Sequence, residues 1–197
     1  MTCTTSSITK LILTTLFFVA AWGCAHGPQF VRINPEINTI SRANSVDVLV
    51  ELSVLDTRGD KKIGTTGNDK ARFDITLKDD IATVLSPKLA AALESQGMSV
   101  ISRPDVNAKK LTISVDRLTL DSLKSEGFGY LTAVNAEVVA SIETNTTRFS
   151  KRYTVSTEKE MSSATSTQTT QEMLNAALSK ALSDVVADEA LIGVLTK

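Results

Sequence analysis

The residues best suited to chemistry lie at the start of this 197-residue chain. Its two cysteines, Cys3 and Cys24, and its single histidine, His26, all precede residue 27. A nucleophile activated by histidine, or a metal site made of cysteine or histidine, therefore cannot form in the rest of the chain. Disulfides cannot staple the fold either, because only two cysteines exist and neither lies beyond residue 24. Of these residues, Cys24 has the most informative surroundings.

A short apolar segment precedes Cys24. Residues 11–21 are mostly apolar, and Lys10 comes before them. A helix of that length would span only about 16 Å, whereas a membrane-spanning helix needs about 20 apolar residues. The pattern is typical of a secretory signal peptide. Residues 21–24 read AWGC and resemble a bacterial lipobox, in which a small residue precedes a cysteine that is acylated and becomes the first residue after cleavage.

We therefore expect residues 1–23 to be a signal peptide, cleaved between Gly23 and Cys24, and Cys24 to carry acyl chains such as palmitate. Two or more acyl chains give stable membrane anchoring. Ala25, not aspartate, follows the cysteine, and resemblance to enterobacterial lipoprotein sorting then implies the outer membrane, with the protein on its periplasmic side. The alternatives are a plain signal peptide cleaved nearby and an uncleaved anchor.

Carboxylates are the remaining candidates for catalysis. Asp56, Asp116 and Asp121 lie at or near the ends of expected strands, and Glu137 lies on the outward face of another. Solvated carboxylates are common at such positions, and Asp56 can form a surface ion pair with Arg58 that contributes little to stability. We therefore assign no catalytic residue, no metal site and no cofactor.

Two glycine-containing stretches are also considered as possible binding sites. Residues 59–66 (GDKKIGTT) resemble a phosphate-binding loop but lack the lysine that must follow the second glycine. Residues 127–130 (GFGY) could display two aromatic rings at a contact surface, or fold both rings back onto the core.

The composition is that of one ordinary globular domain. Hydrophobic residues make up 42% and charged residues 22%. The 21 basic and 22 acidic side chains give a formal net charge of -1. A nucleic-acid partner is therefore not expected, because no broad basic field is present.

Periodicity predicts the elements of this domain. Alternating apolar residues predict strands over residues 46–55, 98–101, 111–120, 130–143 and 148–157. Helical spacing predicts one helix over residues 78–96, interrupted or restarted at Pro87 and ended by Gly97, and a last helix whose capping box is Thr169 and Glu172. Residues 56–70 are expected to form a long polar loop, and the shift of apolar phase after Val115 predicts a bulge.

These elements predict an α+β fold, a two-layer sandwich in which two helices cover a mostly antiparallel sheet of four to five strands. Residues 24–45 are expected to form the lipidated N-terminus and a tether that becomes extended near Phe30 to Ile37. Residues 46–197 then form a single periplasmic domain.

The same layout resembles the YajG family of outer-membrane lipoproteins. The matching stretches are Gly23-Cys24, INPEI at 33–37, DTR at 56–58 with IG at 63–64, MSV at 98–100 after Gly97, LTISVD at 111–116 and LNAAL at 174–178. The resemblance implies no catalytic activity and no active residues, because the family has none established.

The sequence favours a non-enzymatic lipoprotein that binds an envelope protein or acts as a scaffold. One alternative is an accessory lipoprotein for lipid or lipopolysaccharide transport. Another is a carboxylate-based hydrolase of cell-wall glycans, which requires two carboxylates about 5 to 9.5 Å apart in one cleft.

Overall fold

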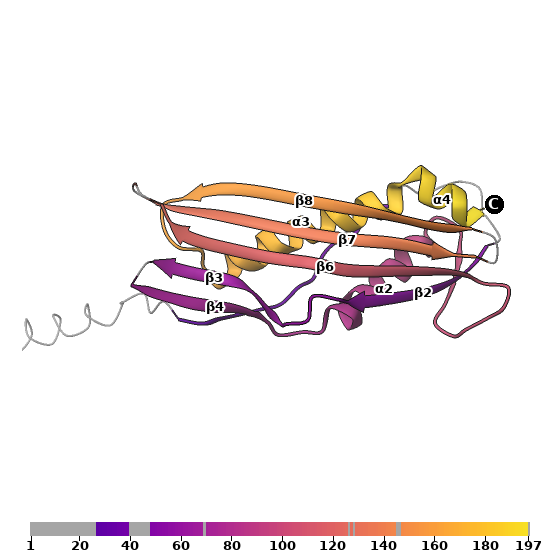
Figure 1. Ribbon diagram of the computed structural model, residues 1–197, viewed down its shortest axis with the longest axis horizontal. Coiled ribbons are helices and arrows are strands. Elements are labelled where there is room, and N and C mark those ends of the chain that lie inside the picture. Colours follow the sequence, from indigo (N-terminus) through magenta and orange to yellow (C-terminus); the bar gives the residue numbers. More distant parts are fainter. Residues whose placement is uncertain are drawn as a thin grey trace, which may run out of the picture.

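The computed structural model describes residues 27–39, 48–68, 70–125, 127, 129–144 and 147–196. These residues form one eight-stranded sheet and three helices (Figure 1). The strands are β1 (Gln29–Val31), β2 (Leu49–Asp56), β3 (Lys62–Asn68), β4 (Ala71–Leu77), β5 (Ser99–Ile101), β6 (Lys109–Lys124), β7 (Tyr130–Glu143) and β8 (Arg148–Met161). The helices are α2 (Ile81–Glu94), α3 (Thr167–Ala187) and α4 (Glu189–Thr196).

Strand β6 determines the shape of the molecule. Its 16 residues extend about 53 Å at about 3.3 Å per residue. One edge of β6 pairs with β7, which in turn pairs with β8, and both pairings are antiparallel. The other edge is shared between two parallel partners, β2 beside its first half and β3 near its end. The sheet therefore branches at β6, with β5 beyond β2, and β4 and β1 beyond β3.

The expected fold class was wrong in the size and character of the sheet. Eight strands are present where four to five were expected, and parallel pairings join β1 to β4, β2 to β5, β2 to β6 and β3 to β6. Three described helices, not two, pack on the sheet. The physical reason is the length of β6, which offers one edge to two short strands in succession.

The predicted apolar faces are confirmed. Alternate residues of β6 and β7 are buried against the helices, and their neighbours form a second face that no described helix covers. The buried positions expected on the last helix are buried in α3: Leu174, Leu178, Ala181, Leu182 and Val185. The bulge expected after Val115 is also confirmed, because the register with β7 shifts between Val115 and Arg117.

Both long helices differ in detail from their expected ends. α2 continues through Pro87 as one helix, and its N-cap is Asp80, whose carboxylate accepts a hydrogen bond from the Thr83 N–H. α3 begins one turn before the predicted capping box. Ser166 is its N-cap and accepts a hydrogen bond from the Thr169 N–H at 3.1 Å.

Strand β3 lies within the stretch that was expected to be a loop, and β4 follows directly after that stretch, where no strand was expected. The composition of β3 indicates a loop because the strand holds two glycines among mostly polar residues. These glycines permit close backbone approaches: a Cβ at Gly64 would lie 1.8 Å from the carbonyl oxygen of Leu120 in β6, and a Cβ at Gly67 would lie 2.1 Å from that of Ala71. The φ angles are 156° and 130°, which favour glycine. The absence of a side chain at Gly64 thus allows β3 to lie against β6.

Replacement of Gly64 tests this close approach. We expect Gly64→Ala to lower the free energy of unfolding by about 3 kcal/mol or more, because the backbone must move to admit the methyl group. Gly193→Ala is the control, because Gly193 lies in helix α4 and a Cβ at this position would meet nothing within 4 Å. Urea unfolding measures both. Similar stabilities for the two variants would contradict the packing of β3 on β6.

Candidate functional site

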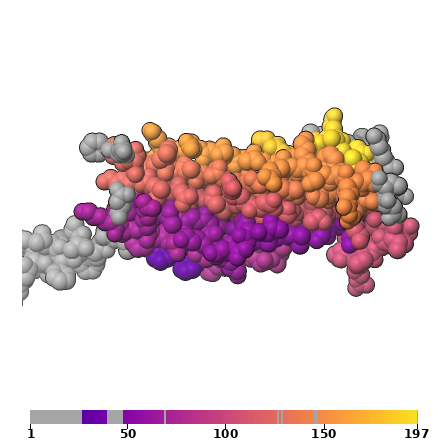
Figure 2. All heavy atoms as spheres, in the orientation of Figure 1, coloured from indigo at the N-terminus to yellow at the C-terminus, as the bar shows by residue number. Residues whose placement is uncertain are grey.

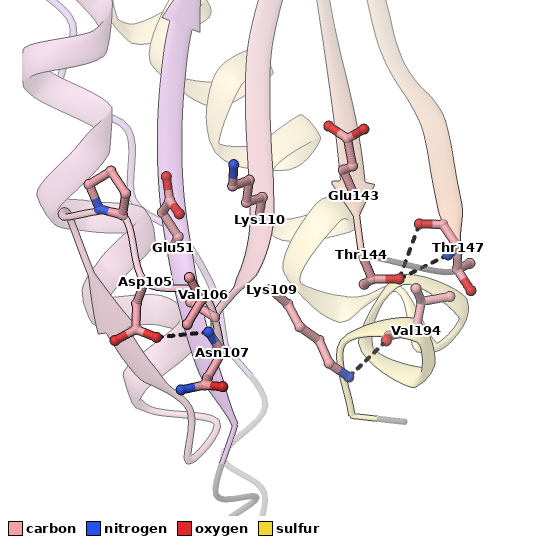
Figure 3. Close-up of a pocket in the computed structure, with 12 residues that line it drawn as sticks. Glu51, Asp105, Val106, Asn107, Lys109, Lys110, Glu143, Thr144, Thr147 and Val194 are labelled. Carbon is pink, nitrogen blue, oxygen red and sulfur yellow. Dashed lines mark hydrogen bonds between the residues drawn. The ribbon is translucent and has the colours of Figure 1, made fainter.

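A broad hollow of about 1180 Å³ lies at the end of the sheet where β6 begins (Figure 3). We call it the loop-end hollow. It is lined by residues 104–110, by Glu51 of β2, by Glu143, Thr144 and Thr147 around the β7–β8 turn, and by Val194 of α4. Residues 102–107 are exposed, and Val106 is 94% exposed. This loop protrudes from the elongated body (Figure 2).

A row of alternating charges crosses four strands at this hollow. Glu51 is paired in register with Lys110, Lys110 with Glu143, and Glu143 with Arg148. Arg148 donates to the Glu143 carboxylate at 2.7 Å. These hydrogen bonds and the charge of Arg148, followed by the charge of Lys110, hold the pKa of Glu143 below its usual range. Opposite charges on neighbouring strands stabilise the pairing of the strands.

The two glutamates of the row do not have the properties of a catalytic pair. Lys110 stands between them, and two strand spacings separate their backbones by about 10 Å. A glycosidase needs one carboxylic acid whose pKa is raised, whereas the pKa of Glu143 is lowered. One oxygen of Glu51, Oε2, is buried without a hydrogen-bond partner among the described residues. The arrangement suits recognition of a charged partner better than acid catalysis.

The carboxylates singled out in the sequence are each occupied by a neighbouring group. Asp56 forms the expected ion pair with Arg58 at 2.8 Å, but the pair is partly buried and not at the surface as expected, because the Arg58 side chain is only 7% exposed. The side-chain hydrogen bond from Arg58 lowers the pKa of Asp56. The other three carboxylates are bonded to side chains on the same or a neighbouring strand or loop. Asp116 accepts hydrogen bonds from Thr57 and Ser114, and Asp121 accepts from Thr65. Glu137 forms an ion pair with Arg152. The structure does not bring them together into one site.

Other residues considered in the sequence lie apart from the loop-end hollow or outside the described ranges. Residues 62–66 of the stretch that resembles a phosphate-binding loop belong to strand β3. Tyr130 begins β7 and is half-buried, while Phe128 lies outside the described residues, as do Cys24, Gly23 and the rest of the predicted signal peptide. Among the described residues, no helix has the length and apolar character needed to cross a membrane, and no group of three or more metal-ligating side chains occurs.

Asp188 holds α4, which lines the hollow, against the sheet. It lies between α3 and α4, and one of its oxygens, Oδ1, accepts a hydrogen bond from the Ala190 N–H at 2.8 Å. The other oxygen, Oδ2, accepts from the Tyr153 hydroxyl at 2.7 Å and from Lys151. Burial raises the pKa of Asp188, but these hydrogen bonds outweigh that effect and lower it to about 2. Burial, and then the hydrogen bond to Asp188, raise the pKa of Tyr153.

The role of Asp188 makes stability depend on pH in a defined direction. Asp188→Asn should lower the free energy of unfolding by about 1–3 kcal/mol at neutral pH, because hydrogen bonds to a charged group are lost. The folded pKa of about 2 lies below the unfolded value of about 3.9. The contribution of the carboxylate is therefore complete above about pH 4 and is lost as the pH falls toward 2.

Urea unfolding of wild type and Asp188→Asn at neutral pH and at about pH 2 measures this effect. The difference between the two proteins should shrink on acidification. Asp184→Asn is the matched control, because Asp184 is 43% exposed in its ion pair with Lys180 and such pairs contribute little. A pH-independent difference for Asp188→Asn would contradict the assignment.

The N-terminal residues form a strap along α3. Residues 32–38 run beside the helix in the same direction, and every second backbone N–H donates to a polar side chain of α3. These hydrogen bonds join Arg32 to Gln171 (2.8 Å), Asn34 to Asn175 (2.7 Å), Glu36 to Ser179 (2.9 Å) and Asn38 to Ser183 (2.9 Å). Val31, Ile33 and Pro35, which alternate with these donors, are buried.

The strap fits along α3 because the spacing of its N–H donors matches the spacing of the acceptor side chains on the helix. Two residues of extended chain advance about 6.6 Å, and four residues of helix advance about 6.0 Å. A polar stripe at every fourth position of α3 can therefore bind every second N–H of an extended chain. The strap is continuous with β1, in which Gln29 is buried and hydrogen-bonded to Thr165 and Thr170.

The polar stripe on α3 was not predicted from the sequence. Its signal was present as Gln171, Asn175, Ser179 and Ser183 beside the apolar stripe, and as the alternation of VRINPEIN at residues 31–38. Neither pattern indicates which segment it contacts, because the two segments lie about 140 residues apart in the sequence.

Loss of the serine hydroxyls should loosen the strap. In Ser179→Ala/Ser183→Ala, the amides of Glu36 and Asn38 lose their acceptors, and their protection from hydrogen exchange should fall by up to about tenfold. Hydrogen exchange followed by nuclear magnetic resonance on the whole chain measures the exchange rates of both amides. Ser86→Ala in α2 is the matched control, because its hydroxyl donates to the Ala82 carbonyl of its own helix. Equal protection in all three proteins would show that the strap is held by its apolar residues alone.

The comparisons with solved structures concern the fold. One structure, titled "Crystal structure of uncharacterized protein", has a TM-score of 0.53 and 12% sequence identity, covering 81% of this chain and 97% of that one. Protein XCC0632 from Xanthomonas campestris, of the DUF330 family, has a TM-score of 0.50 and 17% identity, covering 83% of this chain and 94% of that one. At these identities the similarity shows a shared fold alone.

The comparison with families is more specific. No curated protein matches the sequence. The model of the family Lipoprotein_16, described as "Uncharacterized lipoprotein", matches residues 35–196, which include the second half of the strap, strands β2 to β8 and all three described helices. The chain therefore belongs to this lipoprotein family, the YajG family that its sequence resembles.

Proposed function

We propose that this protein is a lipid-anchored envelope protein on the periplasmic side of the outer membrane, where it binds a protein partner without catalysing a reaction. Membership of a lipoprotein family, together with Gly23-Cys24 after a short apolar segment, carries this proposal. Cys24 bears the acyl chains, including palmitate, that hold the protein on the membrane.

The chemistry of the loop-end hollow favours binding over catalysis. Its charged row is internally paired, and Glu143 is stabilised in its ionised form by Arg148. The lining includes Asp105, Asn107 and Lys109, a polar set that suits a protein or peptide surface better than an acyl chain. Binding of a polar partner is thus better supported than transport of a lipid.

The loop-end hollow is also the best candidate for the contact surface. Val106 offers a large exposed apolar side chain at its rim, and the charged row from Glu51 to Arg148 lies beside it. Protein interfaces combine apolar side chains with polar and charged neighbours. The partner would bring an apolar pocket and groups of complementary charge.

Site-specific photo-crosslinking in cells tests both parts of this proposal. A photoreactive residue is placed at Val106, in wild type and in Cys24→Ser, and radiolabelled palmitate is followed in parallel. We expect label in the wild-type chain alone, and one envelope protein crosslinked in the acylated form. Palmitate in both proteins would contradict anchoring at Cys24.

The control places the same photoreactive residue at Thr154, an exposed position in the middle of β8. It should not crosslink the same partner. Equal crosslinking from both positions would mean that the loop-end hollow is not the contact surface. Co-purified lipid or glycan in place of a protein would shift the function to transport or to the cell wall.

A further inference from the structure

The position of the strap and β1 restricts how the protein can sit on a membrane. β1 pairs with β4 in parallel, with Gln29 opposite Ile75. Followed backward from Gln29, the chain therefore leads toward the start of β4 and the tip of the β3–β4 hairpin, residues 68–71. The strap leaves in the opposite direction and is fixed along α3. Only the few residues before Gln29 remain between the body and Cys24.

The length of that linker can be compared with the distance it must cover. Cys24 lies five residues before Gln29 (29 − 24), and Lys70 at the hairpin tip lies five residues before Ile75 (75 − 70). Five residues of chain reach at most about 17 Å. Cys24 can therefore reach no farther than about the level of the hairpin tip, whatever conformation the linker takes. A lipid attached at Cys24 would draw this end of the molecule down to the lipid surface.

Two hairpin tips and the end of β8 lie at the same level. Gly67 is paired with Leu123 near the end of β6, and Lys124 is opposite Tyr130 at the start of β7. Met161, the last residue of β8, is opposite Tyr130 as well. We call this level the hairpin end. The loop-end hollow lies at the other end of β6, near the C-terminus, along the long axis of the molecule (Figure 1).

The surface of the hairpin end suits a bilayer interface. Lys70 and Lys124 are exposed there, as is Glu160. Leu131 is 42% exposed on the uncovered face and lies opposite Leu123. Lysines with apolar neighbours are favoured at the boundary between lipid headgroups and water.

We infer that the hairpin end is the membrane-facing surface of this protein, and that the short linker between Cys24 and Gln29 holds the body upright on the lipid headgroups. This inference rests on the proposed acylation of Cys24. β6 then spans from the membrane surface to the loop-end hollow, so the hollow stands about 50 Å from the lipid. The partner of the hairpin end is the bilayer, and the opposite end remains open to the periplasm.

Fluorescence quenching in vesicles tests this orientation. The chain has no cysteine after residue 24. The proposed cleavage before Cys24 removes Cys3, and acylation consumes the thiol of Cys24, so one introduced cysteine gives a single labelling site. Lys70→Cys marks the hairpin end, Thr154→Cys the middle of the uncovered face, and Asn107→Cys the loop-end hollow. Each acylated mature protein is labelled with an environment-sensitive dye. It is then placed in phosphatidylethanolamine–phosphatidylglycerol vesicles that contain a headgroup spin-labelled lipid.

A clear loss of dye fluorescence at Lys70→Cys, with little loss at the other two positions, is the expected result. Equal quenching at Thr154→Cys would show that the protein lies flat and would overturn the upright orientation. Quenching at none of the three, in protein whose acylation is verified by mass spectrometry, would overturn the orientation while leaving the anchor intact. Absence of acylation would overturn the proposed anchor and this inference together.

A linker variant isolates the cause. Ten Gly and Ser residues inserted between Ala25 and His26 lengthen the flexible connection without altering the strap. In this variant the quenching of Lys70→Cys should fall to the level of the other positions. Unchanged quenching would mean that the hairpin end binds lipid by itself, and would overturn the role assigned to the short linker.

Discussion

The structure depends on one strand, β6, which is long enough to serve three partners. Its edge toward β7 forms a continuous antiparallel ladder, while its opposite edge is divided between β2 and β3. The division requires that β3 come very close to β6, and Gly64 makes this possible because no side chain stands between it and the Leu120 carbonyl. The branched sheet then offers one long apolar face, and the amphipathic helices α2, α3 and α4 bury their stripes against it.

Much of this fold could be predicted from sequence because alternation and helical spacing report local geometry directly. The apolar faces of β2, β6, β7 and α3 and the bulge after Val115 are of this kind. β3 could not be predicted, because apart from Ile63 it is made of glycine and polar residues whose composition indicates a loop. β4 differs, because Phe73, Ile75 and Leu77 alternate along it as expected for a strand. Parallel pairing was missed because it joins segments distant in sequence, and nothing in either segment identifies the other.

The candidate site shows the same limit. The carboxylates considered from the sequence lie near strand ends or, for Glu137, within a strand. The structure shows each of them bonded to a neighbouring side chain, such as Arg58 for Asp56 and Arg152 for Glu137. The charged row of the loop-end hollow arises only from strand register, which places Glu51, Lys110, Glu143 and Arg148 side by side. Register is a property of the assembled sheet, so these four residues could not be grouped in advance.

The strap has a consequence for the order of events during folding. Its donors lie in residues 32–38, and its acceptors lie about 140 residues later, in α3. A chain that emerges N-terminus first presents its strap long before the helix that receives it exists. During that interval the segment beside the proposed acylation site remains free and accessible to modifying enzymes. Formation of α3 then allows the strap to dock, so the segment that follows the proposed acylation site is fixed only after a helix about 140 residues later has formed.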